Sequence, residues 1–82
     1  MCRVATVKAL DGYCLQIEFT DGVTGTLDVS DRLFGPVFEP LKDPRLFAQV
    51  RVDPFGAICW PNGADLAPDA VHETLAGRHV DA

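Results

Sequence analysis

The chain has 82 residues, of which 48% are hydrophobic, and its 12 acidic and 7 basic side chains give a net charge of -5. This length accommodates one small domain, residues 1–82, which buries so little surface that an interface with a copy of itself or with another chain would add stability. The negative charge repels phosphate backbones and the basic residues are scattered, which argues against direct nucleic-acid binding and favours a basic protein partner.

The segment 3–29 predicts a meander of three antiparallel strands. Two tight turns separate its apolar runs, and they contain Asp11-Gly12 and Asp21-Gly22. Glycine tolerates positive φ, and Asp-Gly pairs are typical of the short connections of β-hairpins. We therefore expect each strand to pair with the one before it.

Alternation within these strands predicts a sheet with one buried face. In the second strand, Leu15, Ile17 and Phe19 are separated by polar residues, so the apolar side chains share one face and the other face meets solvent. In the first strand, Val4 and Val7 break the period of two. A β-bulge, or burial on both faces at one end, accounts for that break.

The segment 30–41 is apolar but interrupted by glycine and proline. Gly35 and Pro36 lie near its middle, and a proline inside a helix removes a hydrogen-bond donor, which excludes a long helix. We expect a structured loop whose aromatic side chains, Phe34 and Phe38, fill the core.

A short helix and a second β-hairpin are predicted next. Asp43 is suited to cap the N-terminus of a helix that begins at Pro44. The segment 53–56 has an early proline and a closing glycine, as β-turns do, and it separates strand-like runs at 51–52 and 57–60. These two runs are expected to pair as a hairpin.

Further turn residues end the second hairpin, and a helix follows them. Asn62 and Gly63 terminate the strand, with Gly63 expected at positive φ. Pro68 opens the last helix, and Gly77 is expected just beyond its end. The expected fold is therefore α+β: a three-stranded antiparallel meander, a short helix, a second β-hairpin and a C-terminal helix.

The sequence contains no motif of a catalytic, cofactor-binding or metal site. Ser30 lacks the strained turn of a serine hydrolase, and His72 and His79 are not one helical turn apart, as zinc ligands on a helix are. No glycine-rich motif for phosphate or dinucleotides occurs either. We expect a protein that is not an enzyme and needs no cofactor or metal.

Cysteine spacing and hydropathy predict the compartment. Cys2, Cys14 and Cys59 form no Cys-x-x-Cys pair, so reduced thiols are expected rather than a disulfide framework or a zinc site. The N-terminus has no signal-peptide core, and no apolar run approaches the roughly 18 residues of a membrane span. We expect a cytoplasmic protein with no membrane partner.

Several motifs resemble those of a known family. They are Phe19-Thr20-Asp21-Gly22, Val37-Phe38-Glu39-Pro40-Leu41 and Trp60-Pro61-Asn62-Gly63-Ala64-Asp65-Leu66. This pattern is similar to the small bacterial family called domain of unknown function 2442, over roughly residues 3 to 76. The resemblance implies a compact α+β domain without an established activity. It also implies a link to antitoxins, because some members resemble the antitoxin half of two-gene pairs.

Three functions are open at this stage. The leading one is a non-enzymatic interaction module of antitoxin type, in which the acidic domain covers a basic partner. The second is a small-molecule sensor or enzyme with a pocket near Trp60 and Phe38. The third is a structural homodimer formed through an exposed sheet edge.

The candidate partner-binding residues are Phe38, Trp60, Asn62 and Asp65. Trp60 is the only tryptophan and is followed directly by turn residues. At a strand end it either anchors an interface or covers the edge of a small core. Asn62 and Asp65 belong to the same stretch as Trp60, so the four residues form one hypothesis.

Overall fold

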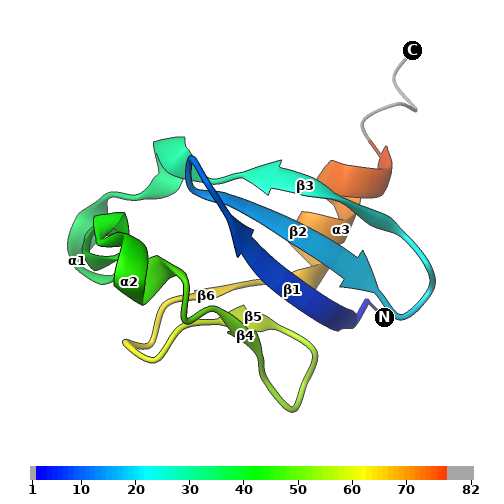
Figure 1. Cartoon of the computed structure of the whole chain (residues 1–82). Helices are drawn as coiled ribbons and strands as arrows, with labels where there is room; N and C mark the ends of the chain where they lie inside the picture. Colours follow the sequence, from blue (N-terminus) through cyan, green and yellow to red (C-terminus); the bar gives the residue numbers. More distant parts are fainter. Residues whose placement is uncertain (1, 78–82) are drawn as a thin grey trace.

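The computed structural model describes residues 2–77 as an α+β fold, shown in Figure 1. Its strands and helices are β1 (Val4–Leu10), β2 (Cys14–Phe19), β3 (Thr24–Asp28), α1 (Gly35–Phe38), α2 (Pro44–Phe47), β4 (Arg51–Val52), β5 (Ile58–Cys59), β6 (Asp65–Leu66) and α3 (Pro68–Gly77). Two 3-10 turns, Ser30–Arg32 and Glu39–Lys42, flank α1. The predicted fold class is confirmed.

The predicted meander is a sheet of strand order β1-β2-β3, and its register explains the broken alternation of β1. Val4 lies opposite Phe19 and Val7 lies opposite Ile17, with a register shift between Val4 and Thr6. The extra residue in β1 acts as a β-bulge and returns both valines to the face that carries Phe19 and Ile17. The bulge, one of the two predicted alternatives, is therefore what the structure contains.

The sheet has one buried and one solvent-exposed face, as predicted. Leu15, Ile17 and Phe19 are buried, whereas Gln16 and Glu18 between them are exposed. Because side chains alternate along a strand, every second residue of β2 points to the core.

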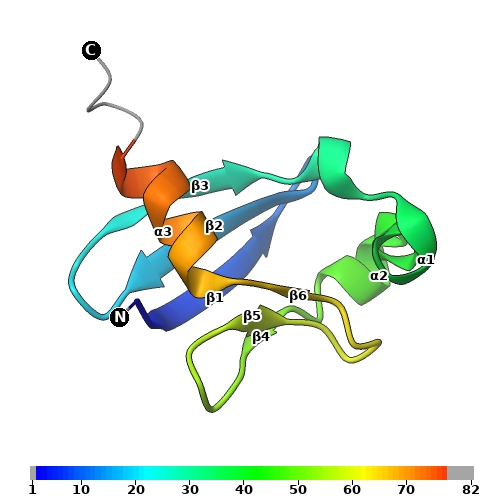
Figure 2. The same ribbon diagram turned by 180° about the vertical axis from the view of Figure 1, so that it is seen from behind.

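Helix α3 crosses the buried face of this sheet, as Figure 2 shows. Val71 is buried, and Leu75 packs over Gly25 of β3, with its Cδ2 3.0 Å from where a Cβ of that glycine would lie. Gly77 is the last residue of the helix rather than the residue beyond it. No helix described between residues 2 and 77 has the length and apolar character needed to cross a membrane.

The predicted second hairpin is part of a second three-stranded sheet, of order β4-β5-β6. The strand-like run at 57–60 is shorter than expected and forms β5. Gly63 has a φ of +94°, as predicted, and the turn around it brings β6 back against β5, where Asp65 pairs with Cys59. β6 has 2 residues, so it carries no alternation that a sequence pattern could reveal.

The segment 30–41 differs from the loop that was predicted. It consists of the two 3-10 turns with α1 between them. Leu33 and Leu41 fill the core, Phe38 is half-buried, and Phe34 is 71% exposed, so the expectation that both aromatics fill the core is wrong for Phe34. Phe34 is the extended N-cap residue of α1, directly before Gly35 at a φ of +86°, and its side chain is directed to solvent while that of Leu33 is buried.

Helix α2 begins as its capping residues predict. Asp43 is the N-cap, and its Oδ1 accepts a hydrogen bond from the backbone N–H of Arg45 at 3.0 Å. Pro44 occupies the first turn, where a missing N–H costs nothing. Phe47, the last residue of α2, is buried and joins the core.

Candidate functional site

Trp60 is part of the core in this structure. Its side chain is 2% exposed, and its Nε1 donates a hydrogen bond to the carbonyl oxygen of Phe47 at 3.0 Å. Its ring lies 5.9 Å from the ring of Phe47 and 6.5 Å from that of Phe38, measured between centroids. Of the two roles considered for Trp60, covering the core describes its position here.

Asn62 joins the turn after β5 to helix α1. Its Nδ2 donates to the carbonyl oxygen of Val37 at 2.9 Å, and its Oδ1 accepts from the N–H of Ala64 at 3.2 Å. The backbone closes the same turn, because Trp60 N donates to Ala64 O at 2.9 Å and Gly63 N donates to Trp60 O at 3.1 Å. One amide side chain therefore fixes both the turn and the helix beside it.

The four candidate residues do not form one surface. Phe38 and Trp60 are in contact, and Asn62 reaches Val37, the neighbour of Phe38. Asp65 is exposed on β6 opposite Cys59 and takes no part in these contacts. The first three candidates thus support α1 from beneath and beside it.

The surface that they support is apolar. We define the α1 patch as Phe34, Pro36 and Val37, which are all exposed. Phe34 is 71% and Val37 42% exposed, and both are large hydrophobic side chains. The patch was not predicted from the sequence, because both aromatic residues of the segment 30–41 were expected in the core. The signal that could have revealed it is Gly35-Pro36, which starts a helix too short to turn all its apolar residues inward.

Charges of both signs border the α1 patch. The two 3-10 turns that flank α1 carry Asp31 and Glu39 together with Arg32 and Lys42, and all four side chains are exposed. The local charge is therefore balanced. The acidic excess that would attract a basic partner comes from the chain as a whole, with 12 acidic and 7 basic residues.

The Trp-Pro-Asn-Gly turn and the strands around it lie within a region shared with a family of known sequences. A family model described as Protein of unknown function (DUF2442) matches residues 4–74. The chain belongs to this family. The match confirms the resemblance drawn from the sequence motifs, whereas no curated protein and no solved structure matches the chain.

A cavity of about 330 Å³ opens on this DUF2442 member between the β1–β2 turn and α2. Tyr13 and Phe47 line it, with their rings edge to face at 5.4 Å, and Phe47 also packs against Trp60. Neither Phe38 nor Trp60 lines this cavity, so its position differs from the pocket that the sequence suggested.

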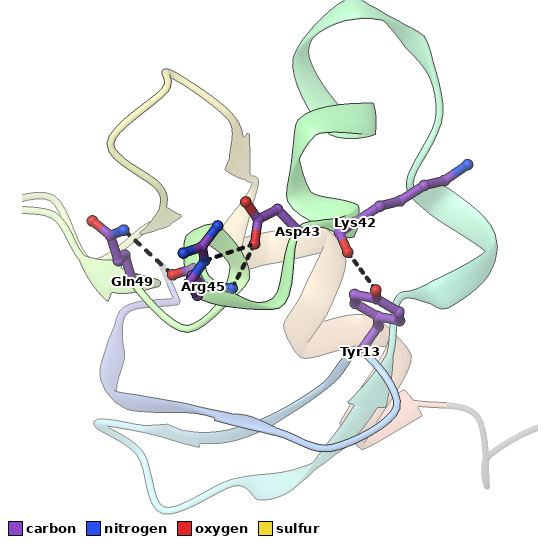
Figure 3. A network of polar contacts seen from close by, with 5 residues as sticks. All are labelled: Tyr13, Lys42, Asp43, Arg45 and Gln49. Atoms are coloured by element: carbon purple, nitrogen blue, oxygen red, sulfur yellow. Dashed lines mark hydrogen bonds and ion pairs between the residues drawn. The ribbon is translucent and has the colours of Figure 1, made fainter.

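Tyr13 fixes the wall of the cavity in an uncommon conformation. Its φ is +60°, a region that residues other than glycine rarely adopt. Its hydroxyl donates to the carbonyl oxygen of Lys42, as Figure 3 shows. The neighbouring contacts of α2 in Figure 3 include the ion pair between Arg45 Nε and Asp43 Oδ1 at 3.7 Å. The hydroxyl and ring contacts thus offset the backbone strain of this turn.

His72 and Asp21 form the polar contact between α3 and the β2–β3 turn. Nε2 of His72 lies 2.8 Å from Oδ2 of Asp21, and the imidazole is edge-on to Phe19 at 4.7 Å. Hydrogen bonds lower the pKa of Asp21, first from the N–H of Val23 and then from His72. His72 is therefore a structural contact rather than a fully solvated residue, and His79 lies outside the described residues.

The described residues offer little metal or thiol chemistry. Among residues 2–77, no three His, Cys, Asp or Glu side chains are close enough together to hold a metal ion. Cys2, Cys14 and Cys59 are free and half-buried. Burial is the largest influence that raises the pKa of Cys2, which makes its thiolate less available as a nucleophile.

Proposed function

We propose that this protein is a non-enzymatic interaction module of antitoxin type, whose α1 patch contacts a basic protein partner. The observation that carries the proposal is the pair of exposed hydrophobic side chains Phe34 and Val37, at the start of and within a helix whose Val37 carbonyl is hydrogen-bonded by Asn62. Single exposed apolar side chains are common, but neighbouring ones that form a patch often mark a contact with another molecule. The acidic excess of the chain adds attraction for a positively charged partner.

Preorganisation supports this role. α1 spans only 4 residues, so it would be marginal in isolation. The Asn62 amide holds its Val37 carbonyl, and the Phe38 ring packs against Trp60. A patch that is ordered before binding loses less entropy on association. The candidate residues Phe38, Trp60 and Asn62 therefore act in binding by positioning α1.

The compartment and the two-gene arrangement belong to the same proposal. The three free thiols suit a reducing compartment such as the cytoplasm. The antitoxin type follows from the family resemblance and the net charge of -5, and it predicts that the product of the adjacent gene is the basic partner.

Co-expression of the tagged chain with the product of the adjacent gene tests the proposal. We expect a complex whose association rate falls as salt rises, because exposed charges are screened. Phe34→Ser should weaken the complex by about 2 kcal/mol, as the loss of an interface anchor does. Phe55→Ser is the matched control, since Phe55 is 80% exposed on the β4–β5 turn, outside the α1 patch.

Two results would overturn the proposal. One is equal weakening by Phe34→Ser and Phe55→Ser, which would show that any exposed phenylalanine has the same effect. The other is a failure to form any complex at low salt while the isolated chain turns over a small substrate. That second result would favour the sensor or enzyme.

The sensor alternative has one specific observation in its favour. The cavity beside Tyr13 has a volume of about 330 Å³, at the lower end of the range for small-molecule sites. Its strained Tyr13 backbone is of the kind that clusters at ligand sites. Saturable quenching of the Trp60 fluorescence by a small aromatic compound, lost in Tyr13→Ala, would promote this function over the interaction module.

A further inference from the structure

β3 is the open edge of the main sheet. In the order β1-β2-β3, the other outer strand is β1, and it lies beside the second sheet, where Val4 N donates to Gly56 O at 2.9 Å. β3 has 5 residues, whereas each strand of the second sheet has 2. Within residues 2–77, all 5 residues of β3 leave their outer edge unpaired, whereas β1 has β4 of the second sheet packed beside it.

The hydrogen-bond pattern shows which backbone groups face outward. Phe19 N donates to Val23 O at 2.8 Å at one end of the β2–β3 ladder, and Val29 N donates to Tyr13 O at 3.0 Å at the other, so Phe19 and Val23, like Tyr13 and Val29, face each other at hydrogen-bonded positions. Such pairs alternate along the ladder, so Thr24, Thr26 and Asp28 direct their N–H and C=O groups away from β2. No backbone hydrogen bond within the described part of the chain joins these outward groups to another element.

β3 has few of the features that usually protect an edge strand. Natural edges are commonly blocked by charged side chains, especially lysine, by proline or by a bulge. β1 has two of these, Lys8 and its bulge. β3, with the sequence Thr24-Gly25-Thr26-Leu27-Asp28, has no lysine, proline or bulge, and its one charge is Asp28 at its end. α3 does not cover the edge either, because Leu75 approaches Gly25 from the buried face.

We propose that two copies of the chain pair antiparallel through β3, with a twofold axis at Thr26, and thereby form one continuous sheet. The N–H and C=O groups that point away from β2 in one copy must pair with the same kind of groups in the other copy. Thr26 then lies opposite Thr26 of the second copy, and Thr24 lies opposite its Asp28. An axis at Gly25 or Leu27 would leave an end of each strand unpaired. The axis at Thr26 is therefore the register that satisfies the most backbone groups.

The side chains are compatible with this register. Two threonines meet on the axis, a cross-strand pair that is favourable in sheets. The Thr24 hydroxyl can donate to the Asp28 carboxylate, whose pKa is already lowered by hydrogen bonds from Ser30. On the other face, Gly25 meets Leu27 of the second copy. No like charges are placed opposite each other, so the strand is complementary to itself.

Salt separates this self-association from the proposed partner complex. Each copy carries a net charge of -5, so two copies repel each other at long range. Screening that repulsion should strengthen the dimer as salt rises. The complex with a basic partner should instead weaken with salt, and it uses the α1 patch rather than β3. The two proposals can therefore fail independently.

Sedimentation velocity of the full chain over a wide concentration range tests the dimer. We expect a monomer–dimer equilibrium that salt shifts toward the dimer. Thr26→Pro removes the outward N–H on the axis without touching the β2–β3 ladder, and it should weaken the dimer about tenfold or more. Thr26→Lys, which places two like charges on the axis, should also weaken it.

Thr24→Lys is the matched control, because the new cation would face Asp28 of the second copy and should leave the dimer as strong or stronger. Circular dichroism verifies that each variant is folded, and if Thr26→Pro does not fold, Thr26→Lys decides the matter. A chain that stays monomeric at every concentration and salt would overturn the proposal. So would a dimer that both substitutions at Thr26 leave unchanged.

Discussion

The β-meander, residues 4–28, and the segment 34–66 are stabilised by different kinds of contact. In the meander, neighbouring strands pair with each other and buried residues such as Ile17 recur with the period of a strand. In the segment 34–66, single contacts between distant residues define the structure, such as the amide of Asn62 on the carbonyl of Val37.

This difference determines how each region should respond to substitution. Backbone ladders in the meander share the stabilisation among many hydrogen bonds. The short helices and strands of the segment 34–66 have few of their own, so they depend on particular side chains. The α1 patch belongs to the second region, so its position depends on residues outside the patch, such as Asn62 and Trp60.

The largest effect is expected for Trp60→Ala in the segment 34–66. It removes a buried ring, its packing against Phe47 and its hydrogen bond to the Phe47 carbonyl, and should cost about 4 kcal/mol in the free energy of unfolding. Urea denaturation followed by circular dichroism measures this. Phe55→Ala, at a residue that is 80% exposed, should change stability by less than about 0.5 kcal/mol. Equal stability of the two variants would mean that Trp60 is not a core residue.

Asn62→Ala should have the next largest effect. It removes the hydrogen bonds to Val37 and Ala64 and should destabilise by about 1.5 kcal/mol. Asn62→Asp keeps the acceptor for Ala64 but places a carboxylate oxygen against the Val37 carbonyl, and because two acceptors repel each other, the loss should be at least as large. The denaturation midpoints of both variants measure how much the Asn62 hydrogen bonds between the turn and α1 stabilise the fold. If both variants unfolded at the wild-type midpoint, Asn62 would not be positioning α1 and its patch.

Gly63→Ala and Gly22→Ala compare the two regions directly. Both glycines have positive φ, and an added Cβ would meet nothing within 4 Å at either position. Backbone strain alone should therefore destabilise each variant by roughly 1 kcal/mol. Thermal melts of the two variants test whether the regions tolerate the same strain equally. A much larger loss at Gly63 would show that its turn is coupled to α1 through Asn62.

The smallest effect concerns Asp21, in the meander turn that faces α3. Its folded pKa lies below its ordinary value of 3.8, mainly because of the Val23 N–H and then His72. A lowered carboxyl pKa stabilises the fold above the unfolded pKa, and this contribution is lost as pH falls through the folded value. Stability of the wild type and Asp21→Asn should differ near neutral pH and converge in acid. A constant difference at all pH values would contradict this linkage.

Local rules predicted much of the fold. The glycine at position 63 was expected at positive φ, and Asp43 was expected to cap a helix, because both depend on neighbouring residues only. The candidate site was predicted less well. Asn62 and Phe38 were predicted from the sequence as partner-binding residues. The sequence could not show that Asn62 binds the Val37 carbonyl or that Phe38 packs against Trp60.

The sequence by itself determined the α+β order of elements, the two turns of the meander and its buried face, because these follow from turn residues and from alternation over adjacent residues. Tertiary structure alone decided the pairing of β6 with β5 and the exposure of Phe34. β6 has 2 residues and α1 has 4, too few for any period to show. The positions of β6 and α1 therefore depend on contacts with residues distant in the sequence, and the local pattern does not show which residues those are.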